Sequence, residues 1–259
     1  MAAITDEQRA RTLARFADHQ RAWDSNAALR ALYADWYGRI RAQLPDPGLG
    51  PWVELGSGPG FARRFIPALQ LSDVVRAPWH DHEISADALP FAAGSLGALV
   101  LFDVLHHLAA PAAFFTEATR ALAPGGRIIL CEPYVSALSF PVYRWFHEEP
   151  LIMKADPFAD HSADAESRDP FDSNQAIPTL MFAREGGRNT FCTRFPALEV
   201  TKVERLAGLA YPSSGGFNAR PMLPFPLWRA LCRIEKALPE WAFRLIGFRV
   251  LIVLRKNSR

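Results

Sequence analysis

A short apolar run that ends in alternating glycines is the feature that most limits how this 259-residue chain can fold. Residues 52–55 read Trp-Val-Glu-Leu, and residues 56–60 read Gly-Ser-Gly-Pro-Gly. Glycines at alternate positions between a strand and a helix let the backbone approach a bound ligand closely. The third glycine comes one residue earlier than in the usual dinucleotide fingerprint, and no Gly-Lys-Ser/Thr of a P-loop follows. The acid at Glu54 favours a ligand with a cationic part over a phosphate.

Short apolar runs alternate with helical patterns through the first half of the chain. We predict strands at 52–55, near 69–75, at 83–86, 96–102 and 127–131, a short helix at 61–65 and a helix at 111–122. The longer helix should end at Pro124-Gly125-Gly126, a strong terminator. Residues 6–43 predict two helices separated near Asp24-Ser25-Asn26, because these residues favour caps. Such alternation predicts βαβ units and a parallel sheet.

The second half of the chain is less regular and richer in proline. We predict helices over 134–146, 175–184 and 228–238, strands over 198–205 and 248–254, and irregular segments over 148–173 and 211–226. The last of these segments reads either as a mobile cover over a site or as a simple connection.

Composition excludes several classes of protein. Lys plus Arg is 29 and Asp plus Glu is 27, so the chain carries no basic footprint for nucleic acid. The three cysteines contain no C-x-x-C pattern, which fits a reducing cytoplasm, and residues 1–15 lack the apolar core of a signal peptide. The most apolar stretch, 241–254, is interrupted by Arg244 and Arg249 and is shorter than the about 20 residues of a membrane span. We interpret it as a helix and a buried strand, with peripheral membrane contact as the alternative.

Five segments in the expected order make the sequence resemble the class I S-adenosylmethionine-dependent methyltransferases. They are Glu54-x-Gly56-x-Gly58-x-Gly60, Asp73, Asp87-Ala88-Leu89-Pro90-Phe91, Asp103-Val104-Leu105-His106-His107-Leu108 and Leu122-x-Pro124-Gly125-Gly126-Arg127. The resemblance covers residues 53–133 and is greatest to the methyltransferase type 11-like group, which includes the ubiquinone/menaquinone-type enzymes. It implies a Rossmann-like, doubly wound α/β fold. The sheet would have seven mostly parallel strands and an antiparallel C-terminal strand, with N-terminal helices and a helical and loop cap.

One departure from the family pattern lies between Asp73 and Asp87. Only 13 residues separate them, in an interval where the family usually has a full helix and a strand. A parallel crossover with its helix normally takes a dozen or more residues by itself. We therefore predict that the helix after the second strand is truncated or absent. The chain is expected to form an N-terminal helical cap (1–48), a cofactor-binding core (49–133), and acceptor-side insertions with the last strands of the same domain (134–259).

The resemblance also implies a set of residues that bind S-adenosylmethionine. Asp73 would hold the ribose hydroxyls, and Asp87 would face the adenine amino group. The complete predicted set is Glu54, Gly56, Ser57, Gly58, Gly60, Phe61, Asp73, Val74, Asp87, Ala88, Leu89, Phe102, Asp103 and His107.

The candidate catalytic residues follow the fourth and fifth strands, where such sheets bind ligands. Methyl transfer from a sulfonium is a direct displacement, so a base is needed only if the acceptor must lose a proton. The candidates are His106, His107, Glu132 and Tyr134, each with a role in shaping the pocket as the alternative. Adjacent residues on a turn point in different directions, so we expect at least one of the two histidines to be structural.

No metal site is predicted from the sequence. His80-Asp81-His82-Glu83 offers ligand types, but adjacent residues in one loop rarely converge on one ion. We interpret this segment as a solvated turn.

The function expected from the resemblance is methylation of a small-molecule acceptor in the cytoplasm. O- or C-methylation of an aromatic, polyketide-like or lipid-like metabolite, as in secondary metabolism, is the leading hypothesis. The alternatives are a protein, peptide or RNA methyltransferase and a cofactor-binding scaffold without catalysis. Asp103-Val104-Leu105-His106 replaces the Asn/Asp-Pro-Pro-Tyr segment of adenine-methylating enzymes, so no nucleic-acid partner is expected. The oligomeric state is left open.

Overall fold

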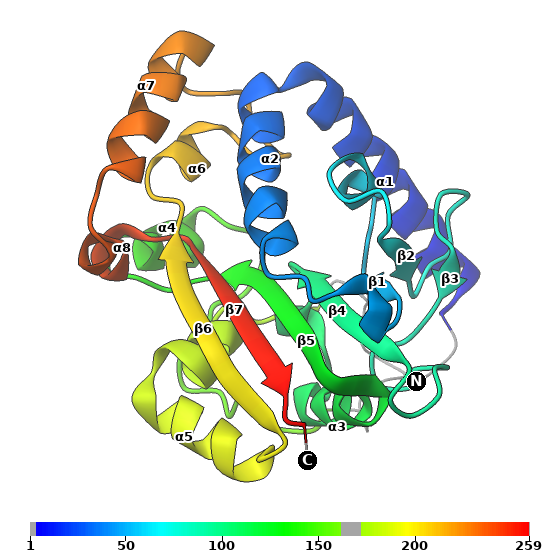
Figure 1. Ribbon diagram of the computed structural model, residues 1–259. Helices are drawn as coiled ribbons and strands as arrows, with labels where there is room; N and C mark the ends of the chain where they lie inside the picture. Colours follow the sequence, from blue (N-terminus) through cyan, green and yellow to red (C-terminus); the bar gives the residue numbers. More distant parts are fainter. Residues whose placement is uncertain (1–3, 162–171, 259) are drawn as a thin grey trace.

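A twisted seven-stranded sheet is the centre of the computed structural model, which describes residues 4–161 and 172–258 (Figure 1). The strands are β1 (Trp52–Leu55), β2 (Gln70–Asp73), β3 (His82–Glu83), β4 (Leu96–Phe102), β5 (Leu122–Pro133), β6 (Leu198–Leu206) and β7 (Arg249–Lys256). They lie in the order β3-β2-β1-β4-β5-β7-β6. The first five strands pair in parallel, and β7 is antiparallel to both β5 and β6. The predicted doubly wound fold with an antiparallel C-terminal strand is confirmed.

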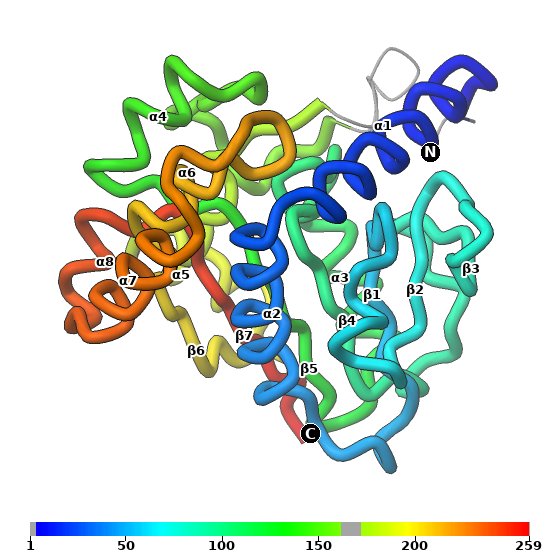
Figure 2. Tube along the Cα trace, turned by 90° about the horizontal axis from the view of Figure 1, so that it is seen from above, coloured from blue at the N-terminus to red at the C-terminus, as the bar shows by residue number. Residues whose placement is uncertain are grey.

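Helices cover the sheet and crowd around the carboxyl ends of its parallel strands. They are α1 (Asp6–Ser25), α2 (Ala27–Arg41), α3 (Pro111–Ala121), α4 (Ser139–Trp145), α5 (Glu185–Arg194), α6 (Ala210–Ser213), α7 (Phe225–Lys236) and α8 (Glu240–Ile246). In Figure 2, α4, α6, α7 and α8 lie on the side of β6 and β7, opposite β2 and β3. None of the helices in the described part of the chain is long and apolar enough to cross a membrane.

The two faces of the sheet carry separate apolar clusters. Leu99 and Leu101 of β4 pack with Phe115 of α3, whereas Val100 packs on the other face with Trp36 of α2. Successive side chains of a strand point to opposite faces, so β4 must be apolar throughout when both faces are covered. All seven of its residues are buried, which explains the uninterrupted run LGALVLF.

The connection between β2 and β3 has no helix, as predicted from its length. Residues 74–81 form turns instead. Trp79 and His80 from these turns pack against Phe16 of α1, with ring centroids 6.4 and 6.0 Å away. Arg9 of α1 also forms an ion pair with Glu83, at 2.9 Å. The N-terminal helix therefore covers the edge that a crossover helix would have covered.

Other elements differ from the sequence prediction in length or type. The helix expected at 61–65 is a 3₁₀ turn, Phe61–Arg64, and the third strand is limited to His82–Glu83. A π-helical turn, Thr179–Ala183, lies within the predicted helix 175–184. The following helix α5 was not predicted, because Gly186 and Gly187 lower its helix propensity. The irregular segment predicted at 148–173 lies partly outside the described residues.

Asn26 links the N-terminal helices to the loop after α6. Its side-chain oxygen accepts a hydrogen bond from the N–H of Leu29 at 3.0 Å and thereby caps α2. Its side-chain amide donates to the carbonyls of Ser214 and Gly216, at 2.8 and 3.3 Å. Asn26 is only 4% exposed, so water could not readily hydrogen-bond to these carbonyls if the amide were removed. The break predicted at Asp24-Ser25-Asn26 is confirmed.

Replacement of Asn26 separates its capping role from its contact with the loop. Asn26→Ser keeps a capping oxygen but loses the amide, and we expect it to cost about 1–3 kcal/mol through the buried carbonyls. Asn26→Ala loses both roles, and we expect about 1 kcal/mol more. Urea unfolding of the two variants and the native protein measures the difference. Equal stability of the two variants would show that the cap contributes nothing.

Candidate functional site

A cavity of about 650 Å³ lies at the carboxyl ends of the parallel strands. Its walls come from α1, the glycine loop 56–60, the ends of β2 and β4, the 3₁₀ turn Leu105–His107, and the loop 211–222. In a doubly wound sheet this edge is the usual place for a ligand, because the strand order reverses there.

The glycine loop is shaped by backbone conformations that other residues rarely adopt. Gly56 and Gly58 have φ angles of +65° and +49°. A Cβ atom at Gly56 would lie 2.5 Å from the Cγ2 atom of Val104. The N–H of Gly58 donates to Oδ2 of Asp73, at 2.9 Å. At Gly56 the loop therefore approaches the turn after β4 more closely than a side chain would allow, and at Gly58 its backbone is bonded to the end of β2.

Two residues of the short β2–β3 connection hold the same loop from the other side. The indole N–H of Trp79 and Nε2 of His80 both contact the carbonyl of Gly58 at 2.8 Å. Nδ1 of His80 accepts from the N–H of Ala77, so Nε2 carries the proton and donates. The interpretation of residues 80–83 as a solvated turn is wrong for His80, which is 4% exposed. The absence of a crossover helix is what brings this residue under the loop.

Glu54 lies below the cavity wall and not in it. It is 1% exposed, and its Oε1 accepts a hydrogen bond from the hydroxyl of Tyr37 at 2.8 Å. Its Oε2 has no hydrogen-bond partner within the described residues. Burial outweighs the hydrogen bonds and raises the pKa of Glu54 to about 7. The carboxylate is therefore poised to respond to a positive charge placed near the glycine loop.

Most of the predicted cofactor residues line the cavity. Those in its wall are Gly56, Ser57, Gly58, Phe61, Asp73, Val74, Asp87, Phe102, Asp103 and His107. Glu54, Gly60, Ala88 and Leu89 are not among the described residues that line it. Leu89 is instead a core residue, 4% exposed, whose N–H donates to Glu117.

The two carboxylates expected to bind the adenosyl group stand in different surroundings. Asp73 is 6% exposed, and its oxygens accept from the N–H groups of Gly58 and Val75. Burial raises the pKa of Asp73 above its ordinary value. Asp87 is half-buried, and it accepts a hydrogen bond from the hydroxyl of Ser85.

Asp103 sits at the end of β4 in a left-handed conformation, with φ of +57°. Its carboxylate is 2.6 Å from Nη1 of Arg249, the first residue of β7. Arg249 is 2% exposed, and its guanidinium lies 5.0 and 5.1 Å from the ring centroids of Trp36 and Phe102. A buried guanidinium needs such a charged partner, so the pair joins β7 to the mouth of the site.

Glu132 fixes the turn after β4 and does not line the cavity. It is fully buried, and its Oε1 accepts from the N–H groups of Val104 and Leu105 at 2.9 and 2.8 Å. Its Oε2 is 2.6 Å from Nδ1 of His106. Burial lowers the pKa of His106, but Glu132 and Glu149 outweigh that effect and raise it to about 10. His106 therefore holds its proton at neutral pH.

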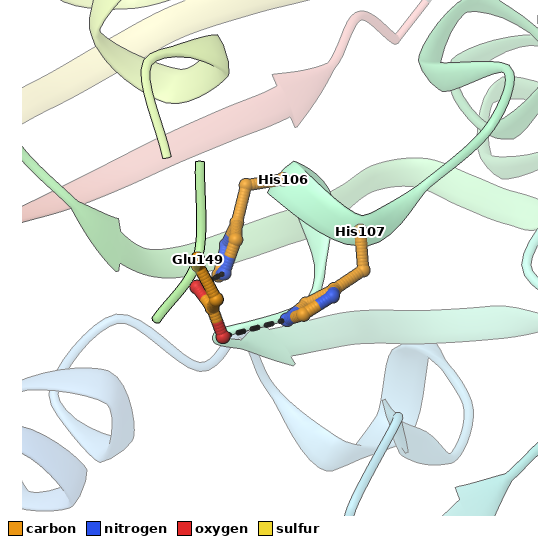
Figure 3. A group of neighbouring side chains, drawn as sticks. All are labelled: His106, His107 and Glu149. Carbon is orange, nitrogen blue, oxygen red and sulfur yellow. Dashed lines mark ion pairs between the residues drawn. The ribbon is translucent and has the colours of Figure 1, made fainter. Parts of the chain in front are cut away.

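Both histidines of the turn face one carboxylate, that of Glu149 (Figure 3). Nε2 of His106 is 3.3 Å from Oε2 of Glu149, and Nε2 of His107 is 3.7 Å from Oε1. The expectation that the two rings point in different directions is wrong: they lie 4.2 Å apart and converge. Burial and the positive charge of His106 lower the pKa of His107 to about 4. His107 is thus neutral at pH 7, and Glu149, whose pKa falls to about 2 through its contacts with the histidines, is ionised.

Glu149 is a site residue that the predicted catalytic and cofactor-binding sets do not include. The sequence marks it only as one of three polar residues, His147-Glu148-Glu149, with contact to a substrate as the lesser of two interpretations. Gln175 from a distant part of the chain donates to Oε2 of Glu149 at 3.1 Å. Tyr134, by contrast, is not among the described residues that line the cavity. Its hydroxyl donates to the carbonyl of Arg244 at 3.3 Å.

The residues present fit S-adenosylmethionine. The glycine loop lacks the Cβ atom that would clash at Gly56, so its backbone can lie close to a ligand. The carboxylates of Asp73 and Asp87 line the cavity and can accept hydrogen bonds from hydroxyl and amino groups. The buried Oε2 of Glu54 lies beneath the loop without a partner in the described residues. This donor and acceptor set matches a nucleoside that carries a cationic amino-acid tail.

Replacing Glu54 tests the cost of burying its charge. A carboxylate with a raised folded-state pKa contributes most stability below its unfolded value, and this contribution is lost as the pH rises through about 7. We expect Glu54→Gln to be about 1–3 kcal/mol more stable than the native protein at pH 8. Near pH 4, below the ordinary pKa of the unfolded side chain, the two should unfold at the same urea concentration. A constant difference at both pH values would contradict the assignment.

Comparison with known proteins supports the same conclusion. Residues 53–130 match the model of the methyltransferase domain family. No curated protein matches the sequence. Among solved structures, an S-adenosylmethionine-dependent methyltransferase from Thermotoga maritima is 15% identical, with a TM-score of 0.53 over 95% of this chain and 99% of that one. One from Mesorhizobium loti is 18% identical, with a TM-score of 0.46 over 86% of this chain and 98% of that one. Residues 53–130 therefore match a methyltransferase domain, and the chain shares the fold of a solved S-adenosylmethionine-dependent methyltransferase.

Proposed function

We propose that the chain methylates a small apolar metabolite, aromatic, polyketide-like or lipid-like, at oxygen or carbon. The observation that carries the proposal is the cavity itself. Its volume, about 650 Å³, falls within the range of pockets that enclose a whole small ligand. Beyond the cofactor residues its walls are aromatic and aliphatic, including Tyr33, Trp36, Tyr211 and Phe217.

The rim of the cavity also favours an apolar acceptor. Phe146 and Met222 line the cavity and are 83% and 71% exposed. Leu227 and Ile234 of α7 and Trp241 of α8 are further exposed large apolar residues, outside the cavity lining. An exposed apolar patch beside a pocket is typical of a surface that meets an apolar ligand.

The expected reaction is a direct displacement in which the cofactor supplies the methyl group. Under the proposal, the glycine loop, Asp73 and Asp87 bind and orient the adenosyl and amino-acid parts. The aromatic walls exclude water, which strengthens the electrostatic contacts within the site. The cluster of His106, His107 and Glu149 faces the cavity and would bind the polar group of the acceptor. Because Nδ1 of His106 is held by Glu132 at 2.6 Å, we assign this residue a positioning role and not that of a base.

Loss of the Asp87 carboxylate should weaken cofactor binding. We expect Asp87→Asn to lower the affinity for S-adenosylmethionine and S-adenosylhomocysteine about tenfold or more, because one charged hydrogen bond is lost. Titration calorimetry measures both ligands. Asp18→Asn, an exposed carboxylate of α1, is the matched control and should bind normally. Native affinity in Asp87→Asn would remove this residue from the site.

The acceptor class is tested by transfer of a labelled methyl group. We expect label in phenols, quinone precursors or lipid extracts, and none in RNA or protein.

His107→Ala and Glu149→Gln should lower kcat/KM for the acceptor by about 100-fold, the size typical of a lost proton-transfer or positioning group. Their affinity for the cofactor should stay within about threefold of native, because both groups act on the acceptor. Label found only in RNA or only in protein would overturn the proposal.

A further inference from the structure

Two imidazoles and a carboxylate converge at the cavity wall in a way that methyl transfer alone does not require. One ring nitrogen of His106, one ring nitrogen of His107 and one carboxylate oxygen of Glu149 lie within 4.8 Å of one another. The histidines come from one 3₁₀ turn, and Glu149 comes from a separate segment that meets them (Figure 3). We infer that His106, His107 and Glu149 bind a divalent transition-metal ion.

The spacing of the ligand atoms fits a tetrahedral site. Ligands about 2.0–2.1 Å from a metal stand roughly 3.3 Å apart at tetrahedral angles. Nε2 of His106 lies 3.3 Å from Oε2 of Glu149, and Nε2 of His107 lies 3.7 Å from Oε1, so each imidazole stands near that spacing from one of the two carboxylate oxygens. Both distances exceed the about 2.7–2.9 Å of a charge-assisted hydrogen bond. The distance between Nδ1 of His106 and Glu132 is 2.6 Å, by contrast, and is that of a direct hydrogen bond.

The contact between His106 and Glu132 is the second feature that points to a metal. A histidine that binds a metal through one ring nitrogen usually donates the other N–H to a carboxylate, which fixes the ring. Glu132 occupies that position, is fully buried, and is itself held by the N–H groups of Val104 and Leu105. Gln175 supports the ligand Glu149 in the same way, through its side-chain amide.

The carboxylates around the cluster are also compatible with a cation. Glu149 lies 3.3 Å from His106 and Glu132 lies 2.6 Å from it, whereas the neighbouring Asp103 is already paired with Arg249. A cation bound between the histidines and Glu149 would give this half-buried carboxylate a partner of opposite charge.

The ligand set also selects the kind of ion. Two imidazole nitrogens and one carboxylate oxygen suit Zn²⁺, Fe²⁺ or Co²⁺, whereas Mg²⁺ and Ca²⁺ prefer oxygen ligands. Three protein ligands leave a coordination position open, and all three residues line the cavity. An oxygen of the acceptor would take that position, and the ion would lower its pKa so that its proton passes to water more readily. The acceptor contact rests on the proposed function, whereas ion binding does not.

Metal binding is tested with the whole chain, free of any histidine tag, after removal of metals by a chelator. Cys192→Ser serves as the background, because that cysteine is exposed and would add a thiolate ligand. We expect one Co²⁺ per chain with the visible absorption of a tetrahedral nitrogen–oxygen site, displaced by Zn²⁺ and not by Mg²⁺. Glu149→Gln and His107→Ala should each weaken Co²⁺ binding at least 100-fold.

Two further variants separate the site from general effects of substitution. Glu148→Gln, an exposed neighbour of Glu149, should bind Co²⁺ as the background protein does. Glu132→Gln keeps an acceptor oxygen for the turn and should lose about 10–100-fold in metal affinity, as expected for a residue that orients a ligand. Calorimetry with S-adenosylmethionine shows that each variant is folded. No Co²⁺ bound, or binding that survives both Glu149→Gln and His107→Ala, would overturn the inference and leave the methyl-transfer proposal standing.

Discussion

The turn that carries His106 and His107 depends on the buried carboxylate of Glu132. Three donors meet it: the N–H groups of Val104 and Leu105 and the ring of His106. These bonds hold the turn after β4 against the end of β5, so that two neighbouring strands present their side chains in one place. A buried carboxylate with this many partners is stable only while all of them are present. The position of His106, and through it that of Glu149, follows from this single group.

The cofactor side depends on close backbone approach. The glycine loop fits between Val104 and Asp73 because it carries no side chains at the narrow points. Trp79 and His80 complete the support from below, through the carbonyl of Gly58. The two halves of the site thus use different chemistry. Backbone shape defines the wall at the glycine loop, and a network of charged side chains defines the wall at His106, His107 and Glu149.

The sequence predicts local elements well and the directions of side chains less well. β4, α3 and the glycine loop carry strong local patterns, so their places follow from the residues alone. The direction of the Tyr134 side chain does not follow from the residues alone. Successive side chains of an extended segment point to opposite sides, and here Pro133 points into the cavity and Tyr134 points away from it. Convergence of His106 and His107 also could not be read, since it requires Glu149 to lie between them.

Glu149 itself shows why long irregular segments limit such predictions. Its place is set by a path that includes hydrogen bonds from Gln175, far along the chain, and no periodicity marks it. The burial of His80 is a second example. It follows from the absence of a helix between β2 and β3. The sequence predicts that absence, but not that His80 then lies between the glycine loop and Phe16 of α1.

That missing helix has a consequence for how the domain can be divided. The edge formed by β2 and β3 is held from outside by Phe16 and Arg9, which belong to the N-terminal helix. The same helix roofs the cavity. The nucleotide-binding half of this protein is therefore not an autonomous unit that begins at its first strand. Trimming the chain to its recognisable core would expose the edge formed by β2 and β3. Any movement of α1 away from the cavity would also remove the contacts that hold this edge next to the glycine loop.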